Sequence, residues 1–104
     1  MKSSITFRHM QASPAIKEYV EDRLTKLEKF AKDPEAHLIL TVEKHTHCAE
    51  VVISSKGVHA QAKASTDDMY SSIDAAIDKV EKTLKKHHDK KLDESHGSLP
   101  VDVT

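Results

Sequence analysis

The chain has 104 residues, which suffices for one domain with a single modest hydrophobic core. Hydrophobic residues make up 38% of the sequence, and no apolar run approaches the length that crosses a membrane. The 16 lysines and arginines are balanced by 17 aspartates and glutamates, which excludes a strongly basic protein, so any nucleic-acid binding must depend on charge gathered on one part of the surface.

The expected compartment follows from the N-terminus and from the cysteine content. The opening residues lack the long apolar segment of a secretory signal. The single cysteine, Cys48, cannot form an internal disulfide and fits a reducing compartment. We therefore expect a cytoplasmic protein that has no contact with a membrane.

The first part of the chain predicts a strand followed by a helix. Residues 4–9 alternate apolar and polar side chains, as in a half-buried strand. Ser13 is suited to cap a helix and Pro14 to occupy its first position, and the helix should continue to about Ala31, before Pro34. The predicted inward face consists of apolar residues at helical spacing: Ile16, Val20, Leu24, Leu27 and Ala31.

Three strands are predicted in the middle of the chain. Residues 38–43, 49–54 and 58–64 each alternate side chains between two faces. Lys56 and Gly57 fit the tight turn between the last two strands. One side of the last strand consists of alanines, and such small side chains would let a helix pack close to the sheet.

The longest predicted helix spans residues 66–91, with Thr66 able to cap its start. Its apolar face is formed by Met69, Ile73, Ala76, Ile77, Val80 and Leu84. Lysines in its second half form one lengthwise row beside that face: Lys79, Lys82, Lys86 and Lys90. Such a row can follow a phosphate backbone, although lysines late in a helix also stabilise its negative end by about 0.3–1 kcal/mol each.

These elements predict an α+β fold, a two-layer sandwich of order β-α-β-β-β-α with a four-stranded sheet and two helices on one face. The folded domain should span residues 1–91. Residues 92–104 contain acidic residues but neither lysine nor arginine, and we expect them to form a flexible tail. With the helices side by side, Arg23, Lys26 and Lys29 would border the same outer surface as the lysine row.

Three segments resemble a known family, the bacterial ribosome hibernation factors, which include short hibernation-promoting factor and ribosome-associated inhibitor A. They are PAIKEYVEDRLTKLEKF in the first helix, VEKHTH in the second strand and DDMYSSIDAAIDKVEKTLKKHHDKK in the second helix. The resemblance covers residues 1 to about 91. It rests on the segments taken together, since no single short motif among them is specific.

The resemblance implies a double-stranded-RNA-binding-like fold and a ribosome hibernation factor that is not an enzyme. Such a protein binds the small ribosomal subunit and its rRNA in the channel used by mRNA and by A- and P-site tRNA, and it inhibits translation in stationary phase or stress. Short forms promote inactive ribosome dimers together with a ribosome modulation factor, whereas the inhibitor A branch opposes dimers. We expect a short form that is monomeric when free and holds no cofactor. The family's RNA-binding positions fall on Arg23, Lys26, Lys29, Lys79, Lys82, Lys86 and Lys90.

Two other classes of function are compatible with parts of the sequence. The fold and the lysine row would also suit a general double-stranded-RNA-binding or ribosome-assembly module that has no part in translation arrest. His45, His47 and Cys48 are residue types that bind metals and would suit a small metal-dependent enzyme. However, Cys48 points away from the strand face that the two histidines share, so we expect no metal site. Aromatic residues make up only 4% of the chain, which argues against recognition of single strands by stacked bases.

Overall fold

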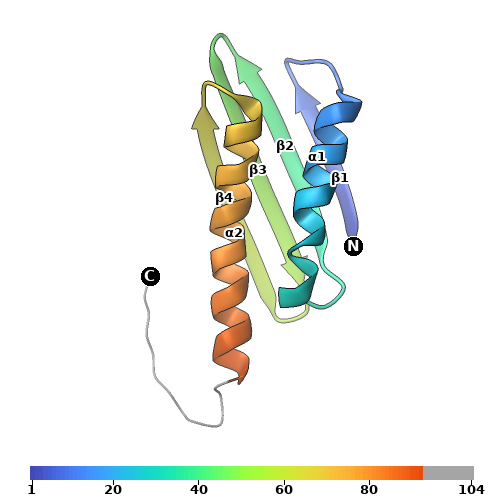
Figure 1. Ribbon diagram of the computed structural model, residues 1–104, viewed down its shortest axis with the longest axis vertical. Helices are drawn as coiled ribbons and strands as arrows, with labels where there is room; N and C mark the ends of the chain where they lie inside the picture. The colour runs from blue at the N-terminus through green and yellow to red at the C-terminus, as the bar shows by residue number, and fades with distance from the viewer. Residues whose placement is uncertain (93–104) are drawn as a thin grey trace.

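The structure, a computed structural model, describes the backbone of residues 1–92 and the side chains of residues 1–89. The predicted order of elements is confirmed (Figure 1). The elements are β1 (Lys2–Arg8), α1 (Pro14–Thr25), the short 3-10 helix η1 (Glu28–Phe30), β2 (Glu35–Glu43), β3 (Thr46–Ser55), β4 (Val58–Thr66) and α2 (Met69–Leu92). The predicted tail, apart from Leu92, lies outside the described residues.

The four strands form one sheet in the order β1-β2-β3-β4. β1 runs parallel to β2, and the other two pairings are antiparallel. One row of partners crosses the whole sheet through Ile5, Leu38, Val51 and Ala62. Because side chains alternate along a strand, this register places the apolar side chains of all four strands on a common face.

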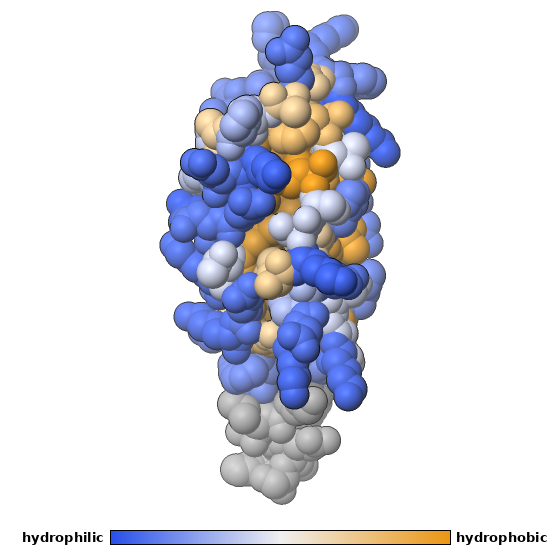
Figure 2. Space-filling view, turned by 90° about the vertical axis from the view of Figure 1, so that its right-hand side faces the viewer, coloured by the Kyte–Doolittle hydropathy of each residue, from blue (hydrophilic) through white to orange (hydrophobic). Residues whose placement is uncertain are grey.

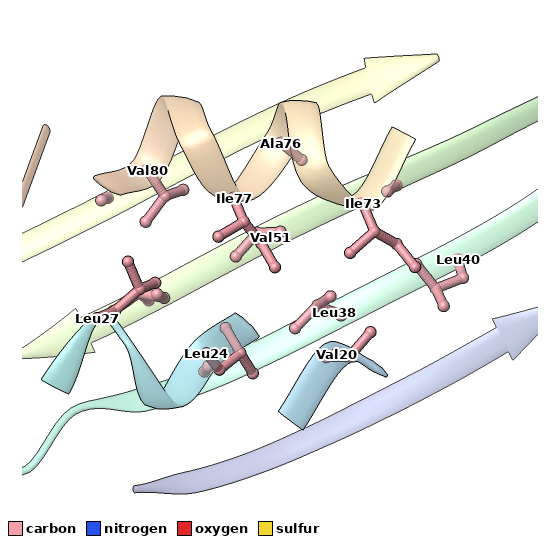
Figure 3. Close-up of a cluster of buried hydrophobic side chains, with 14 of the residues drawn as sticks. Val20, Leu24, Leu27, Leu38, Leu40, Val51, Ile73, Ala76, Ile77 and Val80 are labelled. Atoms are coloured by element: carbon pink, nitrogen blue, oxygen red, sulfur yellow. The ribbon is translucent and has the colours of Figure 1, made fainter. Parts of the chain in front are cut away.

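Both helices cover that face, and the core lies between the two layers (Figure 1). Figure 3 shows Leu24 from α1 and Ile77 from α2 directed toward the sheet, near Leu38 and Val51. The predicted helix positions are buried except Ala31, which is partly buried; Leu24 is 1% exposed and Val80 is fully buried. α2 contacts both β3 and β4. The confirmed two-layer arrangement leaves the outer sides of the helices and the opposite face of the sheet to solvent.

The uncovered face of the sheet is polar. The Ser4 hydroxyl lies 2.6 Å from His37 Nδ1 across the β1–β2 pairing. Gln61 Nε2 donates to the Glu50 carboxylate at 2.8 Å across the β3–β4 pairing. Figure 2 shows the edge of the molecule formed by α1 and β1, where hydrophilic side chains surround a narrow apolar strip. No described helix is long and apolar enough to span a bilayer.

The first helix is shorter than the apolar spacing predicts. α1 ends at Thr25, whose hydroxyl donates to the Glu21 carbonyl at 2.8 Å. The chain then tightens, since the Leu27 amide donates to the Leu24 carbonyl, three residues back, at 2.9 Å. This turn still buries Leu27, which is 1% exposed. The prediction that the helix continues to Ala31 is therefore wrong. A short helix followed by a tighter turn buries the same apolar side chains as a longer helix would, so their spacing does not distinguish the two.

The start of α2 also differs in detail from the prediction. The Ser71 amide donates to Asp68 Oδ2 at 2.9 Å, so Asp68 and not Thr66 caps the helix. Thr66 instead accepts from the Asp68 amide at 3.0 Å and lies 2.7 Å from the hydroxyl of the buried Ser72. Ser72 donates in turn to the His47 carbonyl at 2.6 Å. These bonds fix α2 to the end of the sheet and set the direction in which its side chains point.

Candidate nucleic-acid interface

The lysine row on α2 lies on the side of the helix that faces β4. Lys79 Nζ donates to the backbone carbonyl of Lys63 on β4 at 3.1 Å. Lys82 and Lys86 follow at helical spacing and are exposed. Within residues 1–89 no ion pair joins any of these three lysines to a carboxylate. Three ammonium groups that form no ion pair within residues 1–89 thus lie along one helix, and the side chain of Lys90 falls outside the described residues.

Arg23 on α1 is in a different environment, because its charge is compensated within the protein. Its Nε lies 3.2 Å from Asp74 Oδ1 on α2, an ion pair that lacks hydrogen-bond alignment. Its Nη2 donates to the Tyr19 hydroxyl at 3.1 Å, and its Cζ lies 4.9 Å from the centre of the Tyr19 ring. The Tyr19 hydroxyl reaches both oxygens of Asp74 at 2.7 Å. Tyr19, Arg23 and Asp74 therefore connect the two helices.

The same contacts perturb the protonation of Tyr19 and Arg23. The hydrogen bond to the Asp74 carboxylate is the largest influence on Tyr19 and raises its pKa above the ordinary value of 10.0. The hydrogen bond to Tyr19 is the largest influence on Arg23 and raises the pKa of its guanidinium. Tyr19 therefore stays neutral, and Arg23 charged, at every physiological pH.

A groove of about 520 Å³ separates α1 from α2. Cationic residues line it from the α1 side, namely Arg23, Lys26 and Lys29. Carboxylates line it from the α2 side, namely Asp74, Asp78 and Glu81. Arg23, Lys26 and Lys29 therefore do not form one continuous cationic surface with the lysine row, because the acidic side of α2 lies between the two sets. Sequence reasoning missed this, although the spacing of the three acids at i, i+4 and i+7 is visible in the sequence.

The residues considered for metal binding are dispersed. Cys48 is half-buried and pairs in register with Thr41 and Ser65 on the neighbouring strands. His47 precedes it, so the two side chains point to opposite faces of the sheet. Among the described residues, no group of three or more histidine, cysteine or carboxylate side chains is placed to hold a metal ion.

Comparison with known proteins places this architecture in a family. The model of the family described as "Sigma 54 modulation protein / S30EA ribosomal protein" matches residues 3–92. A ribosome hibernation promoting factor from Azotobacter vinelandii is 31% identical over 103 residues, which are 98% of this chain and 96% of that protein. The protein of the same name from Escherichia coli K12 is 35% identical over 91 residues, which are 86% of this chain and 96% of that protein.

Solved structures agree with the fold. A ribosomal subunit interface protein from Coxiella burnetii superposes with a TM-score of 0.77 at 26% identity, covering 86% of this chain and all of that one. The N-terminal domain of Protein Y from Thermus thermophilus has a TM-score of 0.78 at 24% identity, covering 84% of this chain and 99% of that one, and supports the fold alone. The chain therefore belongs to the Sigma 54 modulation protein / S30EA ribosomal protein family, which confirms the resemblance of its segments to the hibernation factors.

Proposed function

We propose that this protein is a non-catalytic, cytoplasmic ribosome hibernation factor. It binds the small ribosomal subunit at the channel of mRNA and of A- and P-site tRNA and inhibits translation in stationary phase or stress. As a short form it promotes inactive ribosome dimers, together with a ribosome modulation factor. The observation that carries this proposal is the identity of 31–35% to proteins named ribosome hibernation promoting factor, over nearly their whole length.

The charge distribution supports binding to rRNA through its phosphates. Lys79 and Lys86 are separated by about 10 Å along the axis of α2, about the rise along a duplex axis that carries three phosphates of one strand. Their ammonium groups, with that of Lys82, have no carboxylate partner within residues 1–89, so phosphates can replace water around them without breaking an ion pair. The folded body, of 49 × 25 × 16 Å, would then exclude mRNA and tRNA from the same space.

Arg23 on α1 and the two lysines that follow this helix, Lys26 and Lys29, contribute less to the proposed rRNA binding than the lysine row does. Arg23 is held by Asp74 and Tyr19, and Lys26 and Lys29 face carboxylates across the groove. A phosphate approaching this side meets repulsion from Asp78 and Glu81 along with attraction. We therefore assign the first contact with rRNA to the lysine row, with Arg23, Lys26 and Lys29 as a secondary set.

Sedimentation tests the proposal against a general double-stranded-RNA-binding or assembly module. The protein is mixed with purified small subunits, with large subunits and with a free RNA duplex at equal phosphate concentration. Co-sedimentation with small subunits that survives an excess of duplex supports the proposal. Equal binding to all three would assign the protein to the general RNA-binding class instead.

The effect on ribosomes is tested separately on sucrose gradients. Whole ribosomes are incubated with this protein, with a ribosome modulation factor, and with both. We expect the dimer peak to grow only when both are present, and cell-free translation to fall with this protein alone. If this protein instead reduces the dimer peak, it functions like ribosome-associated inhibitor A, the branch of the family that opposes dimers.

A further inference from the structure

A second cationic site lies at the end of the molecule opposite the start of α2. It is a pocket of about 420 Å³ between η1, the β3–β4 turn and the last described turns of α2. Its cationic and titratable side chains are Lys29, Lys32, Lys56, His87 and His88. A volume of this size lies within the range of about 300–1,000 Å³ that is usual for small-molecule sites.

The wall formed by the β3–β4 turn is fixed by backbone geometry. Gly57 has a φ of +85°, which a glycine adopts without strain and which closes the tight turn that carries Lys56. The Ser55 hydroxyl donates to the Lys32 carbonyl at 2.6 Å, and this bond ties the end of β3 to the segment after η1. This bond thereby brings Lys32 and Lys56, which are distant in the sequence, to the rim of the same pocket.

The opposite wall is aromatic and apolar. The rings of Phe30 and His88 meet edge to face, with their centres 6.0 Å apart. The ammonium of Lys29 lies 5.2 Å from the centre of the Phe30 ring. His87 closes the pocket toward the turn, since its Nε2 lies 3.9 Å from the position that a Cβ on Gly57 would occupy. The pocket therefore combines a cationic rim with a partly apolar floor.

The charge of this pocket differs from that of three other hollows lined by described residues. Its described lining includes three lysines and no carboxylate. The interhelical groove balances three cations with three carboxylates, and the two hollows on the sheet face contain Glu35 and Glu43. Of the acidic residues near the end pocket, Glu28 binds the N-terminal ammonium at 2.9 Å. Asp89 lies 3.7 Å from Nδ1 of the pocket residue His88, so one carboxylate stands beside the pocket without lining it. Asp33 follows Lys32 in the chain but does not line the pocket.

We propose that this end pocket binds a nucleotide unit, with the phosphate on Lys32 and Lys56 and the base against Phe30 and Val58. Lysine ammonium groups bind phosphate as point charges, and an aromatic ring offers a stacking surface to any base. The nucleotide can be free or part of an RNA strand, since both present the same phosphate and base. The site is separate from the lysine row and exists whether or not the protein binds ribosomes.

The test measures binding to the full-length protein by calorimetry and by amide NMR shifts. Three probes are used: inorganic phosphate, ADP, and a short single-stranded RNA. We expect ADP, the RNA or both to shift the amides of Lys32, Ser55 and Lys56, and phosphate alone to bind more weakly. Binding by ADP identifies a free nucleotide as a ligand, and binding by the RNA alone identifies an RNA strand. If none of the probes shifts these amides, or if shifts are confined to the lysine row, the proposal is overturned.

A matched pair of double variants separates this site from general charge effects. Lys32→Ala with Lys56→Ala should weaken nucleotide binding by at least about tenfold, because two charge-assisted contacts are lost. Lys2→Ala with Lys17→Ala removes the same charge from exposed positions outside the pocket and should leave binding within about twofold. If both double variants lost the same amount of nucleotide affinity, the proposed site would be refuted. Small-subunit sedimentation of the same variants reports on the proposed function independently, so that either idea can fail without the other.

Discussion

Replacing Lys79, Lys82 and Lys86 together by alanine tests the physical basis of ribosome binding. All three side chains are exposed on α2, and none has a carboxylate partner within residues 1–89. Alanine keeps the helix, because it has the highest helix propensity, and no apolar contact of the core is removed. The variant should therefore unfold at nearly the temperature of the unmodified protein while losing affinity for small subunits.

The expected magnitude follows from counterion release. Each phosphate neutralised contributes about −0.9 to the slope of log affinity against log salt for a duplex, so three lysines contribute about −2.7. Between 50 and 200 mM salt, the unmodified protein should lose about 40-fold more affinity than the triple variant does. Lys79 must first release the Lys63 carbonyl, and if it makes no phosphate contact the difference falls to about 12-fold.

The assay is a titration of small subunits with labelled protein at several salt concentrations. The control variant carries Lys2→Ala, Lys17→Ala and Lys63→Ala, which removes the same charge from exposed positions outside the row. We expect this control to keep the steep salt slope. If the triple variant and the control have the same slope, the lysine row does not bind phosphates, and the reasoning from unpaired ammonium groups is refuted.

Three further predictions concern the helices and the groove between them. Leu24→Ala should lower the free energy of unfolding in urea by about 2–5 kcal/mol, since Leu24 is 1% exposed; a loss below about 1 kcal/mol would contradict the described core. The raised pKa of Tyr19 means that its neutral form stabilises the fold below pH 10, and this contribution is lost as the pH rises through the folded-state pKa. The difference in unfolding free energy between the unmodified protein and Tyr19→Phe should thus become smaller above pH 10 when both are denatured at a series of pH values. A difference that does not change with pH would contradict the stabilising role of the Tyr19 hydroxyl. Asp78→Asn with Glu81→Gln should strengthen binding to small subunits, because it removes repulsion from the groove, and unchanged binding would indicate that the groove stays away from rRNA.

The fold was predictable from the sequence because its periodicities are simple. Alternation in residues 38–43 and 49–54 and helical spacing at positions such as Ile73 and Ile77 specify which side chains are buried, and burial decides how the layers pack. The end of α1 was not predictable in this way. Leu27 is buried after a tighter turn as fully as it would be in a continuing helix, so the apolar pattern does not distinguish the two.

The candidate site was predictable only in part, because charge pairing depends on distances between elements. The spacing of Lys79, Lys82 and Lys86 places them on one side of α2 without knowledge of the rest of the fold. The compensation of Arg23 by Asp74 needs the two helices to be adjacent and in a particular register, which no local pattern specifies. The same applies to the end pocket, whose lining residues come from three separate segments of the chain.

The hydrogen bond from Lys79 to the Lys63 carbonyl also bears on how the free protein avoids aggregation. β4 is an edge strand, and the outward backbone groups of an edge can pair with a strand of another molecule. Lys79 occupies one of these carbonyls and places an ammonium group beside the edge, so a second copy could add its strand there only by burying that charge. If Lys79 binds an rRNA phosphate as proposed, it would leave this carbonyl, and the bound RNA would then cover the edge in its place. One side chain would thereby serve solubility in the free protein and recognition in the complex.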